Sequence, residues 1–199
     1  MHRLGDMPGE QQLTEIWNAL EEGVASARHP FHTAVLATVG AHCGVAEAGE
    51  ARTVVLRGVD RGRGSVIVHS HRESGKISQI RRHPGVTLLL YDPEGRRQLR
   101  LKGKGEVHLC DTVSAERWNE LSEGSRECYL APHPPGAVVD PEAEGAERAK
   151  LSVEEGYRRF AVIEIRLGQI EALFLDHRGH RRRRWDLEGG EAKGIALAP

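Results

Sequence analysis

The sequence is poor in aromatic residues and has almost no net charge. Aromatic side chains make up 5% of the 199 residues, so few are available to stack on nucleic-acid bases. Lys and Arg number 28 against 29 Asp and Glu, which gives a formal charge of −1. No overall field therefore attracts nucleic acid or an anionic membrane, and any anion must be bound by a local group of cations.

Cysteine is also scarce, and long apolar segments are missing. Cys43, Cys110 and Cys128 are odd in number and widely spaced, which fits neither a disulfide framework nor a zinc site and is typical of reduced thiols. The first residues lack the apolar stretch of a signal peptide, and no run approaches transmembrane length. We therefore expect a cytoplasmic protein with no membrane partner.

The sequence does contain many short apolar segments joined by brief connections. Short links favour antiparallel pairing, so we predict a mainly β protein with helices, an antiparallel split β-barrel, as a single domain over residues 1–199. Its expected parts are an N-terminal helix (1–28, periodic from Leu13 to Val24), further helices at Ser74–His83 and Val113–Leu121, loops at Gly40–Gly49 and 131–150, a C-terminal strand and tail (177–199), and strands at Phe31–Val39, Ala51–Val59, Ser65–Ser70, Val86–Tyr91, Arg97–Leu109 with a kink at Gly103 or Gly105, Phe160–Arg166, Ile170–Leu175 and His180–Leu187.

A candidate anion site follows the strand that ends at Ser70. Ser74 is a good helix N-cap, and Lys76 falls in the first helical turn, where free N–H groups favour an anion. A lysine there opposes the helix dipole and is not explained by helix stability. A bound phosphate and a plain surface position account for it equally well. His69 and His71 have the alternate spacing of metal ligands on a strand, but no third ligand follows at a recognisable interval, so we expect no metal.

Two further groups of cations stand on predicted strands. Arg52 and Arg57 are five residues apart, so on a regular strand they face opposite ways and share one ligand only at a strand end or across a bulge. Near the C-terminus, the residues Arg178, His180, Arg182 and Arg184 share one face. Such a basic run forms a solvated surface, a nucleic-acid patch or an anion-binding cleft.

These motifs, in this order, resemble the pyridoxamine 5'-phosphate oxidase family of FMN-binding proteins. The resemblance rests on Arg52–Arg57, Val66–Ser70, Ser74–Lys76 and Arg97–Leu99, and extends to the Arg178-x-His180-x-Arg182 pattern and the closing Leu197–Pro199. It covers Phe31 to Leu109 well and the end of the chain more loosely. It implies a split barrel that binds FMN between the subunits of a homodimer.

The resemblance also implies roles for individual residues. Arg52 and Lys76 would hold the FMN phosphate, and Gln98 would bond the flavin ring. Gly75 replaces an arginine of the family's Ser-Arg-Lys, and His69-Ser70 replaces Tyr-Thr. The full cofactor set is Arg52, Thr53, Val54, Val55, Leu56, Arg57, His69, Ser70, Ser74, Lys76 and Gln98, with Arg182 or Arg184; the substrate set is Arg57, Ser125, Arg126, Arg178 and His180.

The implied activity is hydride transfer from a small substrate to FMN, with no catalytic acid, base or nucleophile from the protein. Arg57 replaces the family's lysine and no tyrosine precedes Ser125, so we expect feeble oxidation of pyridoxine or pyridoxamine 5'-phosphate and a different substrate. Two other readings stay open: a flavin- or haem-binding barrel without turnover, with His69 or His180 as haem ligand, and a nucleic-acid binder using Arg181–Arg184, which is the weakest.

Overall fold

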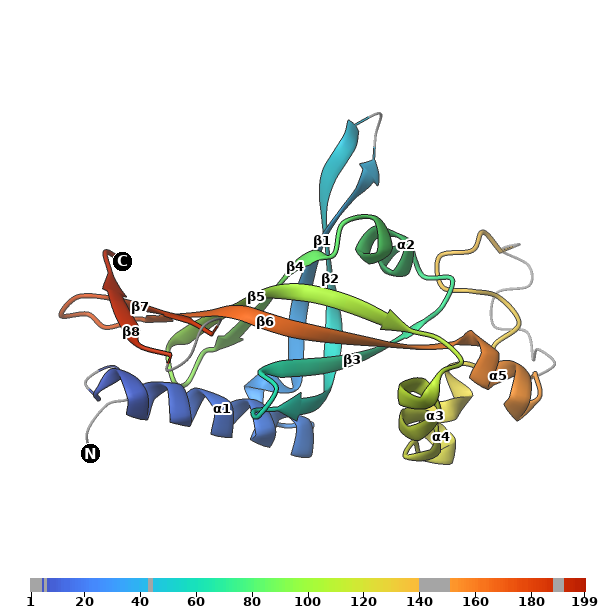
Figure 1. Cartoon of the computed structure of the whole chain (residues 1–199), viewed down its shortest axis with the longest axis horizontal. Coiled ribbons are helices and arrows are strands. Elements are labelled where there is room, and N and C mark those ends of the chain that lie inside the picture. The colour runs from blue at the N-terminus through green and yellow to red at the C-terminus, as the bar shows by residue number, and fades with distance from the viewer. Residues whose placement is uncertain (1–4, 6, 43–44, 140–150, 188–191) are drawn as a thin grey trace.

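A computed structural model describes residues 5, 7–42, 45–139, 151–187 and 192–199. Helices surround one twisted antiparallel sheet (Figure 1). The elements within these residues are α1 (Gly9–Ala25), η2 (Pro30–His32), β1 (Thr33–His42), β2 (Val45–Asp60), β3 (Ser65–His71), α2 (Gly75–Arg82), β4 (Gly85–Asp92), β5 (Arg97–His108), α3 (Thr112–Asn119), α4 (Glu123–Glu127), α5 (Val153–Arg159), β6 (Phe160–Phe174), β7 (Arg181–Asp186) and β8 (Gly194–Leu197).

The sheet closes into a barrel and then continues beyond it. The strand order is β3-β2-β1-β4-β5-β6-β7-β8, and β3 also pairs with β6. The first six strands therefore form a closed antiparallel barrel, and β7 and β8 extend outward from β6. This confirms the split-barrel prediction. Alternate residues of the strands point into the barrel, among them Leu36, Leu56, Leu88 and Leu101, which are fully buried.

Two helices cover the barrel core. The apolar face of α1 buries Ile16, Trp17 and Leu20, and α2 adds Ile77 and Ile80 to the same core. The periodicity read from the sequence therefore predicts both helices correctly. A second, smaller core lies on the outer side of β3 and β6, where α3 packs Trp118 against Ile67, Phe160 and Val162.

Three expectations about the strands were wrong. The segment Gly40–Gly49 is mostly strand: β1 and β2 pair from Val39↔Gly49 to His42↔Val45 and form a hairpin arm that projects from the barrel (Figure 1). The predicted strands at Phe160–Arg166 and Ile170–Leu175 are one strand, β6. The C-terminal tail contains β8, which pairs with β7. In each case cross-strand hydrogen bonds outweigh weak local β-propensity.

An irregularity is present at Gly103, where it was predicted, although the extra residue lies on β6 and not on β5. The register between β5 and β6 shifts between Lys102 and Gly103. A Cβ on Gly103 would lie 2.2 Å from the carbonyl oxygen of Arg166, so only glycine permits this close approach of the two strands.

Some expectations fall outside the described residues, namely those for Cys43 and for the loop segment 140–150. Residues 131–139 contain no helix or strand, and α4 was not predicted. The described thiols, Cys110 and Cys128, are free. No helix in the described part of the chain is long and apolar enough to cross a membrane. Within the same residues, no group of His, Cys, Asp or Glu is arranged to hold a metal ion.

Candidate functional site

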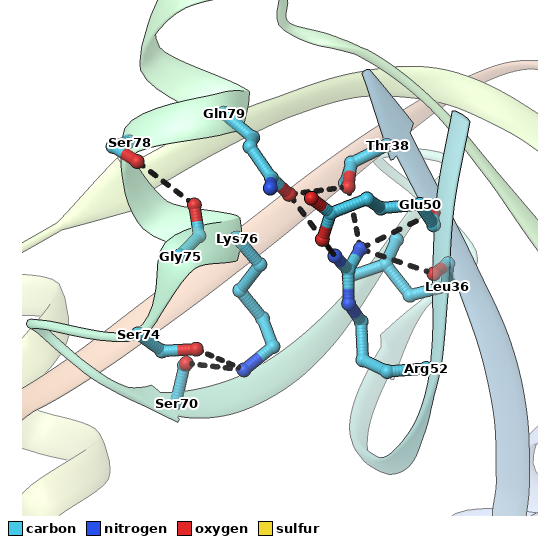
Figure 2. A network of polar contacts seen from close by, with 10 residues as sticks. All are labelled: Leu36, Thr38, Glu50, Arg52, Ser70, Ser74, Gly75, Lys76, Ser78 and Gln79. Carbon is cyan, nitrogen blue, oxygen red and sulfur yellow. Dashed lines mark hydrogen bonds and ion pairs between the residues drawn. The ribbon is translucent and has the colours of Figure 1, made fainter. Parts of the chain in front are cut away.

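The first turn of α2 holds a lysine that turns back toward β3. Lys76 Nζ donates to Ser74 Oγ at 2.6 Å and to Ser70 Oγ at 3.1 Å (Figure 2). Ser74 is the N-cap residue, as predicted, but its side chain makes no capping bond to the helix. The hydroxyl that would normally satisfy the helix N-terminus is therefore directed to Lys76 instead.

Arg52 reaches the same end of the barrel from β2. Its Nη1 donates to Thr38 Oγ1, and its Nη2 donates to Glu50 Oε2 at 2.9 Å and to Gln79 Oε1 at 3.0 Å (Figure 2). Gln79 lies one turn after Lys76 on α2, and its Oε1 also accepts from Thr38 Oγ1 at 2.7 Å. The guanidinium is thus held in place by neighbours from β1, β2 and α2.

Arg52, Ser70, Ser74 and Lys76 form what we call the phosphate corner. Burial lowers the pKa of Lys76, and the positive charge of Arg52 lowers it further. Within the described residues Lys76 has hydroxyl partners and no carboxylate. Arg52 pairs with Glu50, whereas the half-buried Lys76 has no anionic partner, which is unfavourable unless an anion joins it. The corner therefore fits a phosphate group at a helix N-terminus.

The corner carries fewer cations than the family pattern. Gly75 supplies no side chain at the position where the family has arginine. Arg72 does not take its place, because its Nη1 donates to the carbonyl of Arg158 in α5 at 2.8 Å. Arg52 and Lys76 are thus the cations that would meet the phosphate.

The remaining residues of the Arg52–Arg57 motif divide between the two faces of β2. Val54 and Leu56 are buried in the barrel core, so only their backbone is available to a cofactor. Thr53 and Arg57 are exposed on the opposite face. The β2–β3 register shifts between Leu56 and Gly58, but this bulge does not bring Arg57 to the phosphate corner.

His69 lies on the outer face of β3, beside the second core. Its ring packs edge-on against Phe160 with centroids 4.9 Å apart, and neither ring nitrogen has a hydrogen-bond partner in the described chain. Burial, together with the charges of Arg57 and Arg117, lowers the pKa of His69 to about 4. Burial likewise raises the pKa of Tyr129, which packs against Phe160, to about 12. His69 is therefore neutral at pH 7.

Two of the predicted substrate residues, Ser125 and Arg126, lie in α4. Arg126 donates to the carbonyls of Trp118 and Asn119 at 3.3 and 3.1 Å, and its guanidinium lies 5.6 Å from the centre of the Trp118 ring. Ser125 Oγ accepts a hydrogen bond from Ser122 Oγ at 3.0 Å. Both side chains thus stabilise the end of α3 and the start of α4.

The predicted C-terminal residues form a separate group. Arg182 Nη2 donates to Glu171 Oε1 at 2.7 Å, and Arg184 pairs with Asp186 at 3.1 Å. Arg178 and His180 are exposed in the turn before β7. Figure 1 shows α2 and β7 at different ends of the sheet, so one chain does not bring this group to the phosphate corner.

Gln98 shares a face of the sheet with the arginines of β7. Cross-strand partners lie on the same face, and Gln98 pairs with Tyr91 and Leu173, which in turn pairs with Arg182. The next row on this face joins Thr53, Val35, Leu89, Arg100, Glu171, Arg184 and Ile195. Several of its apolar members are exposed: Val35, Leu89, Ile195 and, in the first row, Tyr91. We call these two rows the outer sheet face.

Sequence reasoning missed three residues that bond to Arg52 of the corner, namely Thr38, Glu50 and Gln79. Gln79 is three residues after Lys76 and so lies on the same side of α2, which was a usable signal. Glu50 is two residues before Arg52 and shares its face of β2. Both residues lie outside the motifs on which the family resemblance rests.

Comparison with known proteins agrees with this architecture. Residues 14–109 match the family model described as "Pyridoxamine 5'-phosphate oxidase, FMN-binding domain". No curated protein matches the sequence significantly.

Three solved structures have a similar fold. A pyridoxamine 5'-phosphate oxidase-related, FMN-binding protein from Nostoc punctiforme has a TM-score of 0.75 and 23% identity, over 94% of this chain and 96% of that chain. PhzG from Burkholderia lata, in complex with tetrahydrophenazine-1-carboxylic acid, has a TM-score of 0.71 and 23% identity, over 100% of this chain and 97% of that chain. A Clostridium acetobutylicum protein related to general stress protein 26 has a TM-score of 0.57 and 12% identity, over 90% and 96%.

At these identities the structural likeness shows the fold, and the family model adds the sequence match. The match includes β1 to β5, the phosphate corner and Gln98. Residues 14–109 therefore match the FMN-binding domain of the pyridoxamine 5'-phosphate oxidase family, and the whole chain has the split-barrel fold of the similar structures.

Proposed function

We propose that this protein is an FMN-dependent oxidoreductase that works as a homodimer. The observation that carries the proposal is Lys76: a half-buried lysine next to Arg52, at a helix N-terminus, bonded only to hydroxyls among the described residues. Bound FMN supplies a ring that accepts a hydride from the substrate. Arg52, Ser70, Ser74 and Lys76 bind its phosphate, and Gln98 orients the ring.

The outer sheet face supports the homodimer. Exposed apolar residues are expected at an interface, and Leu89 and Tyr91 are 37% and 50% exposed in the single chain. Gln98, Arg182 and Arg184 lie on the same face, so pairing two copies through it brings these residues to the subunit boundary. We propose that the arginines of one subunit reach the flavin of the other.

The dimer is tested by sedimentation of the wild type and of Leu89→Asp. A charge in the buried centre of an interface is costly, so the variant is expected to sediment as a monomer and to bind FMN more weakly. Val153→Asp is the matched control, because Val153 is exposed on α5, away from this face. A wild-type monomer that binds FMN fully would contradict the proposed interface.

FMN binding is tested by titrating the purified protein with FMN. Binding is expected to quench flavin fluorescence, to give a two-band visible spectrum and to raise the melting temperature. Unchanged fluorescence and melting temperature at saturating FMN would rule the cofactor out. A sharp Soret band after purification would indicate a haem protein instead.

The substrate is proposed to be a small molecule other than pyridoxine or pyridoxamine 5'-phosphate. Arg57 replaces the family's lysine, and Arg126 is bonded to backbone carbonyls of α3. Losing one charged hydrogen bond costs about 1.5–3 kcal/mol, or roughly ten- to a hundredfold in rate. Steady-state assays with pyridoxine and pyridoxamine 5'-phosphate are expected to give kcat/KM below about 10⁴ M⁻¹s⁻¹. A higher value would show that these replacements do not impair binding of the substrate phosphate.

A nucleic-acid function has no support in the arginine strand. The four arginines of β7 are bonded within the chain, to Gly5, Glu171, Gln12 and Asp186 respectively. Side chains used in this way are not available as a set to contact phosphates along a nucleic-acid strand.

A further inference from the structure

A carboxylate lies inside the phosphate corner. Glu50 Oε2 is 2.9 Å from Arg52 Nη2, and the two residues are on the same face of β2 (Figure 2). The side chains are 34% and 22% exposed, so the pair is partly shielded from water. Glu50 stands directly opposite Thr38 across the β1–β2 ladder, which fixes its backbone at the base of the hairpin arm.

The bonds of Arg52 leave no free pair of N–H groups for a phosphate fork without a rearrangement. Both terminal nitrogens of the guanidinium donate to the protein: Nη1 to Thr38, and Nη2 to Glu50 and Gln79. A phosphate that binds Arg52 through a fork of two N–H groups has to displace at least one of these acceptors. Thr38 and Gln79 are neutral and can bond to a phosphate in other ways, whereas a carboxylate repels it.

The charges of the corner point to the same residue. Arg52 and Lys76 contribute two positive charges, and Glu50 cancels one of them. A flavin phosphate carries about −1.5 to −2 at pH 7. Before FMN binds, half of the positive charge of the corner is therefore already paired with Glu50. Among the partners of Arg52, Glu50 is the one that a phosphate repels most strongly.

We propose that Glu50 is a built-in competitor of the cofactor phosphate for Arg52 and lowers the preference of the site for FMN over unphosphorylated riboflavin. The proposal rests on the proposed FMN function. Glu50 acts on the phosphate through Arg52, so it is a specificity-determining residue of the cofactor site and not a catalytic one.

The test compares the dissociation constants of FMN and riboflavin for the wild type and for Glu50→Gln, by fluorescence titration. Removing a repulsive half-buried charge is expected to tighten FMN about three- to tenfold and to leave riboflavin within about twofold. The gain is expected to shrink with added salt, because screening weakens the repulsion. Glu50→Ala is expected to act in the same direction, since it removes the same charge.

Glu47→Gln is the matched control. Glu47 lies on the same strand as Glu50, and its carboxylate pairs at 3.9 Å with His83 rather than with Arg52. Its substitution by Gln removes the same charge as Glu50→Gln. It is expected to change FMN binding by less than about twofold. Equal tightening in Glu47→Gln and Glu50→Gln would overturn the proposal, because the effect would then come from net charge.

A positioning role for Glu50 predicts the opposite result. If the carboxylate mainly orients Arg52, both Glu50 variants bind FMN as the wild type does or more weakly, and the proposal is overturned. The proposed function fails separately: in that case the wild type and every variant bind neither flavin. Inorganic phosphate gives a second measurement, since it is expected to compete with FMN at lower concentration in Glu50→Gln than in the wild type.

Discussion

Around α2 the cations Arg52 and Lys76 lie beside each other, whereas along β7 the arginines are each bonded to a separate group of their own chain. Glu171 shows how the second region is built. Burial would raise the pKa of this carboxyl, but the hydrogen bond from Arg182 and the charge of Arg100 lower it on balance. The side chain is 7% exposed, so Glu171 is ionised and firmly paired. Lys76 has no such partner among the described residues.

This difference separates ion-paired cations that stabilise the fold from Lys76, which has no anionic partner among the described residues. In β7 the ion pairs tie β5, β6 and β7 together across the sheet. In the phosphate corner the fold holds Lys76 in a half-buried position that lowers its pKa. The fold tolerates this unfavourable position, and a bound anion would relieve it. The comparison predicts that substitutions in the two regions change different quantities.

The largest effect on stability is expected for Glu171→Ala. It leaves Arg100 and Arg182 without their shared carboxylate, and removing one member of a buried pair costs about 3–5 kcal/mol. Both arginines are about one-third exposed, so we expect a loss of about 2–3 kcal/mol in the free energy of unfolding. Glu50→Ala is the control in the other region, with an expected loss below about 1 kcal/mol. Urea unfolding measures the free energy of unfolding of both variants. Similar losses in the two would contradict the distinction between the regions.

Lys76→Ala is expected to give the largest effect on FMN. Losing a charge-assisted hydrogen bond to phosphate weakens FMN by about 1–3 kcal/mol, while riboflavin changes little. The unliganded protein is expected to lose no stability, because a desolvated cation has been removed. Fluorescence titrations with both flavins and urea unfolding provide the measurements. Equal weakening of FMN and riboflavin would show that Lys76 does not contact the phosphate.

His69 is expected to make the protein less stable in acid. Its pKa is about 4 in the folded protein and about 6.5 when unfolded, so the unfolded chain binds more protons between these values. Stability is therefore complete above pH 6.5 and falls as the pH drops toward 4, by up to about 2 kcal/mol after allowance for partial exposure. His69→Leu removes this dependence. Urea midpoints of both proteins at pH 7 and pH 5 test it, and parallel curves would contradict it.

The smallest effect on stability is expected for Arg184→Ala. The pair with Asp186 is exposed on both sides, so its loss costs less than about 0.5 kcal/mol. If the arginine reaches the flavin of the partner subunit, FMN binding nevertheless weakens by about 1 kcal/mol at protein concentrations where the dimer forms. Unchanged FMN affinity would leave Arg184 with a structural role only.

Local sequence patterns predicted most elements of the fold, because helical periodicity and strand alternation report which face of each element is buried. They identified α1, α2, the strands of the barrel and the irregularity at Gly103. They failed for the arm at Gly40–Gly49 and for β8, where small residues carry no side-chain signal and pairing with a neighbouring strand decides. The break expected between Arg166 and Ile170 is likewise absent, because pairing with β5 continues through it.

The residues of the candidate site were likewise predicted only in part from the sequence. The sequence by itself predicted an anion site at Ser74 and Lys76, because N-cap chemistry is a local property, and the family resemblance added Arg52. Only the tertiary structure decided that Glu50, Thr38 and Gln79 surround Arg52, that Val54 and Leu56 belong to the core, and that His69 lies among aromatic rings with Arg57 near it. Such neighbours come from different strands and helices, and the register that brings them together is set by packing of the whole barrel.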